Sequence, residues 1–315
     1  KLGLDRSARK VFGKDFPELW EEWREYETSR FKDFQMEGRQ ETETGWDMKY
    51  AKIQNGKLYY QQEFYRKTGA FKGMNFGDLI ERDLATGKER KILTNINFAT
   101  PFKIKNGKLY YTFAFVKTGY DNSCLRSFGQ YVCLQEMDFK GKKNKTILRD
   151  TIRAFDILED GRVIYSKDRQ DRFGSEIFIK EPGSKSPKML FQTDYLLQEL
   201  ESSDGRLITV ARKDWETFSI FMLNLETQEF TPLIKTAHLE FGISTQGERL
   251  FFSANYQKKL SSYCYDFTTG KVYRLTENGL AIFPVYDENN NQLYYIGMNS
   301  NGYDIYAKPA DFREF

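Results

Sequence analysis

The hexapeptide Asn-Gly-Lys-Leu-Tyr-Tyr occurs at residues 55–60 and again at residues 106–111. An Asn-Gly pair is a strong signal for a two-residue turn between antiparallel strands, because both central positions of that turn take a positive φ. The apolar and aromatic residues after the turn are typical of a strand. Looser copies of the same turn and strand are centred on Gly161, Gly205, Gly247 and Asn291. The chain therefore contains six related units.

Successive units are 51, 54, 44, 42 and 44 residues apart. Each has an apolar stretch before the turn, a strand after it, a variable loop and a third strand. A Thr-Gly-Lys turn at 86–88 and again at 269–271 leads into a fourth strand. Four short antiparallel strands in each repeat are typical of a β-propeller blade. A single long solenoid is the alternative, but it does not explain why the sixth unit ends after its third strand, at Phe315.

The polar segment 35–44 can supply the missing strand of the sixth unit. Joining strands from both ends of the chain removes the exposed sheet edge that an open propeller would leave. We therefore predict an all-β fold, a six-bladed β-propeller of four-stranded antiparallel blades over residues 35–315, closed by an N-terminal strand.

Residues 1–34 are predicted to be a separate helical extension. Asp15 and Glu18 form a capping box, and aromatic residues recur at helical spacing within 11–31, so we expect a short amphipathic helix there. Its aromatic face packs either on its own domain or on a preceding one. The chain begins at Lys1 with no initiator methionine or signal segment, which indicates a piece of a longer protein.

The composition and motifs of the chain argue against several classes of function. The chain has 315 residues and a formal charge of +3, too small for a general nucleic-acid binder of this length, and no apolar run is long enough to span a membrane. Its single histidine, His238, has no second histidine or Cys-x-x-Cys beside it, and no Gly-x-Ser-x-Gly occurs. We expect no metal site, no cofactor and no catalytic triad.

The clearest family likeness lies in residues 274–309, with Leu-Thr, a proline-containing strand, a turn, a second strand and Tyr-Asp-Ile-Tyr. This run resembles the propeller repeat of the TolB family and of prolyl-oligopeptidase-type proteins, and the likeness covers about 35–315. Residues 12–26 are similar to the helical tail of the peptidase MA-like domain that precedes TolB-type propellers in some bacterial envelope proteins. The resemblance implies a periplasmic, secreted or cell-surface location, but the peptidase motif His-Glu-x-x-His is absent.

The loops between the second and third strands are expected to share one face of the propeller. Together they hold 12 basic and 6 acidic residues, with many aromatic side chains. Arginine and aromatic residues are enriched at the centres of interfaces. The predicted binding residues of this loop face are Tyr65, Lys72, Tyr120, Arg126, Phe128, Arg172, Arg212, Trp215 and Lys258. The longest loops belong to blades 1 and 2, where we place the contact surface, and the partner is expected to be acidic.

Two cysteines bear on the redox environment. Cys124 and Cys133 lie nine residues apart within one long loop and form a candidate disulfide, which would require an oxidising compartment. Two unpaired thiols are the equal alternative. Cys264 is expected to be a core residue.

Three functions remain open on the sequence. The preferred one is a non-catalytic scaffold that binds a protein or peptide on the loop face, within a larger envelope or secreted protein. The alternatives are a carboxylate-based hydrolase, a glycosidase or peptidase-associated enzyme with its site in the channel, and a structural spacer. A propeller specifies no chemistry by itself, and converging carboxylates in the channel would favour the hydrolase.

Overall fold

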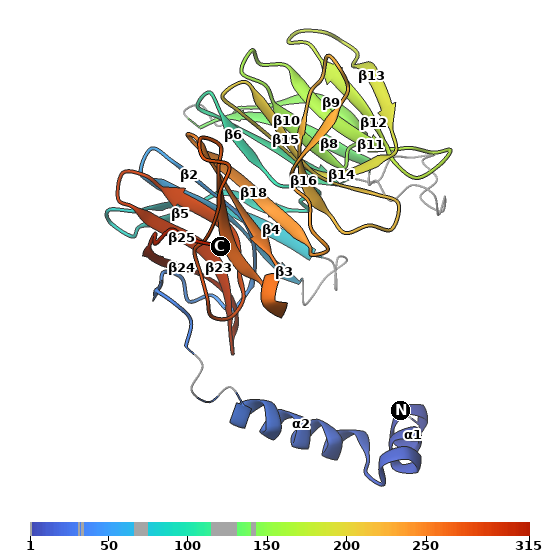
Figure 1. The fold of residues 1–315 in the computed structure, drawn as a ribbon, viewed down its shortest axis with the longest axis vertical. Helices are drawn as coiled ribbons and strands as arrows, with labels where there is room; N and C mark the ends of the chain where they lie inside the picture. The colour runs from blue at the N-terminus through green and yellow to red at the C-terminus, as the bar shows by residue number, and fades with distance from the viewer. Residues whose placement is uncertain (1, 31, 33–34, 66–74, 115–130, 140–142) are drawn as a thin grey trace. The chain divides into compact units, whose positions relative to one another are not determined.

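A computed structural model describes residues 2–30, 32, 35–65, 75–114, 131–139 and 143–315. Its strands form six antiparallel sheets, each of which is one blade of a β-propeller (Figure 1). The prediction of a six-bladed all-β propeller is confirmed.

The first three blades each contain four consecutive strands. Blade 1 consists of β2 (Asp47–Gln54), β3 (Lys57–Tyr65), β4 (Asn75–Asp83) and β5 (Glu89–Ile96). Blade 2 consists of β6 (Lys103–Lys105), β7 (Lys108–Ala114), β8 (Tyr131–Asp138) and β9 (Asn144–Thr151). Blade 3 consists of β10 (Ala154–Ile157), β11 (Val163–Asp168), β12 (Ser175–Lys180) and β13 (Lys188–Thr193).

The last three blades include the strands from the two ends of the chain. Blade 4 consists of β14 (Tyr195–Ser203), β15 (Arg206–Lys213), β16 (Ser219–Leu223) and β17 (Phe230–Ile234). Blade 5 consists of β18 (Glu240–Gln246), β19 (Arg249–Ala254), β20 (Ser261–Asp266), β21 (Val272–Arg274) and the C-terminal β25 (Arg313–Glu314). Blade 6 consists of β22 (Ala281–Asp287), β23 (Gln292–Asn299), β24 (Gly302–Pro309) and β1 (Arg39–Gln40).

The repeated Asn-Gly turns have the backbone geometry that the sequence predicted. Asn55 and Gly56 have φ values of 52° and 69°, and Asn106 and Gly107 have values of 50° and 69°. Positive φ at both central residues gives the turn a twist that matches the flanking strands. Each turn therefore sets the register between the first and second strands of its blade.

Neighbouring blades pack through shared clusters of buried apolar side chains. The ring closes where Leu58 and Tyr60 of blade 1 meet Ile296 and Ile305 of blade 6. Between blades 5 and 6, the rings of Phe251 and Tyr286 stack with centroids 5.2 Å apart. Aromatic side chains bury about 150–250 Å² each, so these seams account for much of the hydrophobic stabilisation.

The N-terminal strand closes the propeller as predicted. Arg39 and Gln40 of β1 pair antiparallel with Ala307 and Tyr306 of β24, which completes blade 6. The fifth strand of blade 5 was not predicted: β25 pairs with β21. That strand is only two residues long, too short for an alternating pattern to reveal it in the sequence.

Contacts divide the chain into two units, Lys1–Met36 and Glu37–Phe315. The first contains two helices, α1 (Leu2–Phe12) and α2 (Phe16–Arg30), where the sequence predicted one. The capping box at the start of α2 is present, since the Asp15 amide donates to Glu18 Oε2 (3.0 Å) and the Glu18 amide to Asp15 Oδ1 (3.2 Å). The division into domains at residues 34 and 35 remains a prediction about independent folding.

Blade 1 carries a buried acid whose pairing predicts an acid-sensitive contribution to stability. Glu81 accepts bonds from Lys57 Nζ (2.9 Å), Tyr59 Oη (2.9 Å) and Arg90 Nε (2.7 Å). Burial opposes its ionisation, but the hydrogen bonds from Arg90 and Lys57 outweigh burial and lower its pKa from 4.5 to about 2.

A lowered folded-state pKa stabilises the protein above the unfolded pKa, and this stabilisation is lost as the pH falls towards the folded value. We expect Glu81→Gln to flatten the decline in unfolding free energy between pH 4.5 and about 2, measured by urea denaturation. An unchanged pH profile in the variant would contradict this assignment.

Candidate binding site on the loop face

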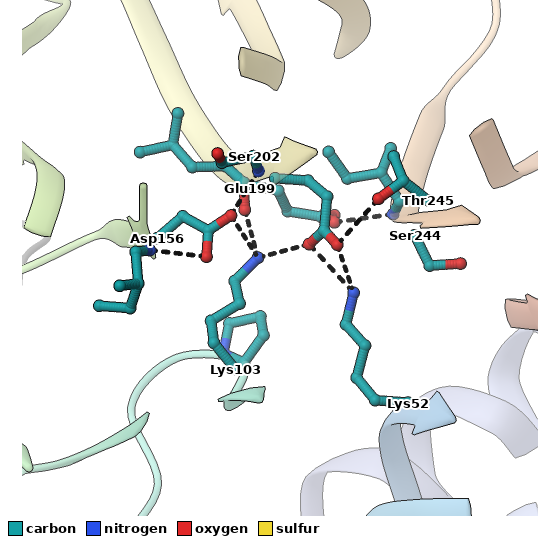
Figure 2. Close-up of polar contacts among 12 residues, drawn as sticks. Lys52, Lys103, Asp156, Glu199, Ser202, Ser244 and Thr245 are labelled. Atoms are coloured by element: carbon teal, nitrogen blue, oxygen red, sulfur yellow. Dashed lines mark hydrogen bonds and ion pairs between the residues drawn. The ribbon is translucent and has the colours of Figure 1, made fainter. Parts of the chain in front are cut away.

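The first strands of the blades place a cluster of buried charges in the central channel, which Figure 2 shows as two lysines reaching towards carboxylates of other blades. Lys103 of β6 has Nζ 2.7 Å from Glu201 Oε2 of β14 and 3.9 Å from Asp156 Oδ2 of β10. Lys52 of β2 donates to both oxygens of Glu201, at 2.9 and 3.0 Å. The cluster thus connects four blades.

Carboxylate oxygens of Glu199 and Asp156 in the channel also accept backbone hydrogen bonds. Glu199 Oε1 and Oε2 accept from the amides of Gly242 (2.8 Å) and Ile243 (3.0 Å) in blade 5. Asp156 Oδ2 accepts from the Ser202 amide in blade 4. Buried charges are stable only when such partners replace the lost water.

The pKa values of Glu199 and Glu201 are shifted in opposite directions. Burial raises the pKa of Glu201, but the charges of Lys103 and Lys52 outweigh burial and hold it well below its usual range. The pKa of Glu199 is raised, because its burial outweighs the two backbone amide bonds that favour the ionised form. Glu201 is therefore a fixed negative charge between two lysines.

The two cavities described in the channel are small. Two channel cavities have volumes of about 30 Å³ and 150 Å³, whereas small-molecule sites usually occupy about 300–1,000 Å³. Carboxylates do converge in the channel, as a hydrolase would need, but they are engaged by lysines and backbone amides. The arrangement favours a structural role for the cluster.

A larger depression lies on the loop face between blades 3 and 4. Its cavity volume is about 760 Å³, within the range of ligand sites. Three of the predicted binding residues line it together: Arg172, Arg212 and Trp215. Phe173 and Phe218 line it as well. We call this depression the blade 3–4 groove.

Most cations of the groove already have partners. Arg153 forms a two-pronged pair with Asp168, with Nη2 to Oδ2 at 2.5 Å. Arg169 pairs with Asp171, at 2.9 and 2.7 Å, and this hydrogen bonding lowers the pKa of Asp171 to about 2. A further aspartate, Asp194, lies 3.4 Å from Arg172 Nη2 and 3.5 Å from Arg169 Nη1.

Arg212 differs from these three arginines. It lies on β15, with its guanidinium carbon 4.9 Å from the centroid of the Phe218 ring and 5.5 Å from that of Phe173. Its Nε is buried without a hydrogen-bond partner, and no carboxylate pairs with it within the described part of the chain. Cation–π contact holds the charge in place without neutralising it.

Trp215 adds an exposed aromatic surface to the groove. The residue is 92% exposed, far more than a tryptophan packed in a core. Phe173 and Phe218 were not among the predicted binding residues, although Phe173 falls in a loop already recognised as aromatic-rich. Only the structure shows that both rings contact Arg212.

The remaining predicted binding residues lie elsewhere. Lys258 is exposed at the end of the short 3₁₀ helix η1 (Tyr256–Lys258) in blade 5 and does not line the blade 3–4 groove. Tyr65 is the last residue of β3, and its side chain is not described. Outside the described residues lie Lys72, Tyr120, Arg126 and Phe128. The predicted contact surface of blades 1 and 2 therefore remains a prediction.

The cysteines and the histidine fall at separate places. Cys133 is buried on β8, where its Sγ accepts a bond from Gln135 Nε2, while Cys124 lies outside the described residues. The candidate disulfide therefore stays a prediction. Cys264 is buried in blade 5, and burial raises its pKa to about 12. His238 is exposed before β18, 5.4 Å from the Tyr256 ring.

Solved structures share this fold. The chain is similar to the acylaminoacyl peptidase of Pyrococcus horikoshii, with a TM-score of 0.54 and 15% identity over 85% of this chain and 44% of that one. It is also similar to the β-propeller domain of the Trilobed protease from Pyrococcus furiosus, with a TM-score of 0.54 and 11% identity over 85% and 97% of the two chains. TolB from Acinetobacter baumannii matches with a TM-score of 0.49 and 14% identity, over 82% and 68%.

The two Pyrococcus likenesses show the fold that the sequence predicted, a β-propeller of the kind found in such peptidases, and TolB is also among the similar structures. At such low identities they show the fold alone. The chain spans less than half the length of the acylaminoacyl peptidase. No protein-family model matches the sequence, and no curated protein is similar to it at the level of sequence.

Within the described residues, no helix has the length and apolarity needed to cross a membrane. The same residues contain no group of three or more histidine, cysteine, aspartate or glutamate side chains arranged to hold a metal ion.

Proposed function

We propose that this propeller is a non-catalytic scaffold that binds an acidic protein or peptide segment on its loop face. The observation that carries the proposal is the blade 3–4 groove, in which Arg212 and the exposed Trp215 lie together. Binding sites concentrate their energy in a few aromatic and arginine side chains surrounded by weaker contacts. No carboxylate of the described residues pairs with Arg212, and this charge supports an anionic partner.

The chemistry of the channel supports the same choice. Its charged side chains bind one another across the blades, and its cavities of about 30 Å³ and 150 Å³ leave little room for a substrate. A rigid, closed ring is well suited to present loops in a fixed geometry, because loops carry recognition best when a scaffold positions them.

We also place the chain within a longer bacterial envelope protein, exported to the periplasm or cell surface, with a peptidase-like domain upstream. The similarity of residues 12–26 to the helical tail of such a domain supports this. A His-Glu-x-x-His motif encoded upstream of Lys1 is the expected finding, and an unrelated upstream sequence would contradict it.

The binding face can be tested with random twelve-residue peptides displayed on phage, one library tethered through the peptide C-terminus and one with that terminus free. We expect selection on the full chain to enrich binders, and Trp215→Ala to weaken the best synthetic binder by 10-fold or more, about 1.4 kcal/mol. Isothermal titration calorimetry measures the effect.

Met189→Ala is the matched control, because Met189 is also an exposed large apolar residue, 46% exposed on β13, but does not line the groove. Its binding should equal that of the unmodified chain. Failure to enrich any binder, or equal binding by the Trp215 variant, would remove the groove from the proposal.

A further inference from the structure

We infer that the blade 3–4 groove contains a subsite for one peptide carboxylate, and that Arg212 is the residue that pairs with it. This inference rests on the proposed function and names the chemical group that the partner must present. The carboxylate belongs either to an aspartate or glutamate side chain or to a peptide C-terminus, since both offer the same planar pair of oxygens.

Among the described residues, the charges of the groove leave one arginine without a carboxylate partner. Three arginines around it have aspartate partners: Arg153 has Asp168, Arg169 has Asp171, and the third, Arg172, lies 3.4 Å from Asp194. No such partner pairs with the fourth, Arg212, among the residues that the structure describes.

The surroundings of Arg212 hold it ready for a planar anion. The rings of Phe173 and Phe218 lie 5.5 Å and 4.9 Å from its guanidinium carbon. Aromatic contact restricts the side chain without using its N–H donors. Its Nε is buried and has no acceptor among the described residues, and a buried donor without a partner is unfavourable. A carboxylate that accepts from the guanidinium fork removes this cost.

One uncompensated positive charge matches a carboxylate better than a phosphate group. A phosphomonoester carries a charge of about −1.5 to −2 near neutral pH, so it would bring negative charge beside Asp168 and Asp171, which also line the groove. Trp215 lines the same groove and is 92% exposed. The partner segment is therefore expected to carry a large apolar side chain close to its carboxylate.

The test uses the best binder selected on the full chain. Each acidic side chain is replaced in turn by its amide, the C-terminus is amidated in a separate peptide, and dissociation constants are measured by calorimetry. We expect one of these changes, and only one, to weaken binding by about 10-fold to 100-fold, as the loss of a charge-assisted pair does. A sensitive side chain or a sensitive C-terminus distinguishes the two sources of the carboxylate.

The assignment to Arg212 is tested by coupling. Arg212→Met should weaken binding of the acidic peptide by the same factor as the amide replacement does. It should leave binding of the amide peptide unchanged, because both changes remove the same ion pair. Arg212→Lys keeps a cation but loses the planar fork, so it should restore only part of the affinity. Thermal melting of each variant confirms that the chain is folded.

Arg206→Met is the matched control, because Arg206 also lies on β15 over a phenylalanine ring, Phe267 at 4.7 Å, but it pairs with Glu248 at 2.6 Å and lies outside the groove. This variant should bind the acidic peptide as tightly as the unmodified chain does. Binders that need Trp215 but tolerate every amide replacement would contradict the carboxylate subsite. They would not contradict the proposed scaffold function. Tighter binding of a phosphoserine peptide through Arg212 would also overturn it, and the absence of any binder would overturn both proposals.

Discussion

Replacing Lys103 with methionine is expected to lower the free energy of unfolding by about 3 kcal/mol, because the buried Glu201 keeps only Lys52 as a lysine partner and Asp156 loses the charge of Lys103. Lys103 is 6% exposed, and its Nζ lies 2.7 Å from Glu201 and 3.9 Å from Asp156. Methionine fills a similar volume but cannot donate a hydrogen bond. Urea denaturation of the full chain, followed by circular dichroism, measures the change.

Lys108→Met provides the control for this prediction. Lys108 lies on the next strand and pairs with Glu136 at 2.8 Å, but its side chain is 44% exposed, and exposed pairs contribute about 0–1 kcal/mol. A double variant, Lys103→Met with Glu201→Gln, should be less destabilised than the sum of the two changes. Equal effects of Lys103→Met and Lys108→Met would show that the channel cluster does not stabilise the ring.

The second large effect is expected at Asp304, which connects the two ends of the propeller. Its buried carboxylate accepts from Thr42 Oγ1 (2.9 Å), the Thr44 amide (2.9 Å), Gln40 Nε2 (3.2 Å) and Asn299 Nδ2 (3.1 Å). Asp304→Ala removes all four of these hydrogen bonds, including the one from the buried Thr42 hydroxyl, so we expect a loss of about 3 kcal/mol in unfolding free energy.

Hydrogen–deuterium exchange locates this effect. In the Asp304→Ala variant, the amides of residues 39–44 should exchange much faster than in the unmodified chain, because β1 loses its attachment to blade 6. Asp47→Ala is the control, because the Asp47 side chain is 43% exposed and pairs only at 3.4 Å with Lys49 Nζ. The exchange of residues 39–44 should not change in this variant. Unchanged protection of residues 39–44 would mean that β1 is held by its backbone pairing with β24 alone.

The fold could be predicted because its signals are local and repeated. Asn55-Gly56 and Asn106-Gly107 specify the same turn with neighbouring residues only, and the φ values of the structure agree. The closing strand could be predicted as well, because the sixth unit lacked one strand and a sheet edge must be covered. The two-residue β25 was missed because it is too short to show a pattern. The N-terminal helix α1 was missed although Leu4, Ala8 and Val11 recur at helical spacing.

The sequence predicted the site only through the amino-acid composition of the loops. Arginine and tryptophan in the loops indicated a binding face, and Arg172, Arg212 and Trp215 do line one groove. Nothing in the order of residues distinguishes Arg212 from Arg172, because each is a basic residue in a loop or at a strand end. The difference depends on an aspartate beside one and two phenylalanine rings beside the other.

The sequence by itself therefore determined the number of blades, the turns within them and the way in which the ring closes, because hairpins depend on residues that are neighbours in the chain. Tertiary structure alone decided which charges are paired. Lys52 and Glu201 are 149 residues apart yet lie 2.9 Å from each other across the channel. No carboxylate of the described residues pairs with Arg212, which lies in a groove shared by two blades. Ion pairing falls off with distance in space, and only the closed ring sets those distances.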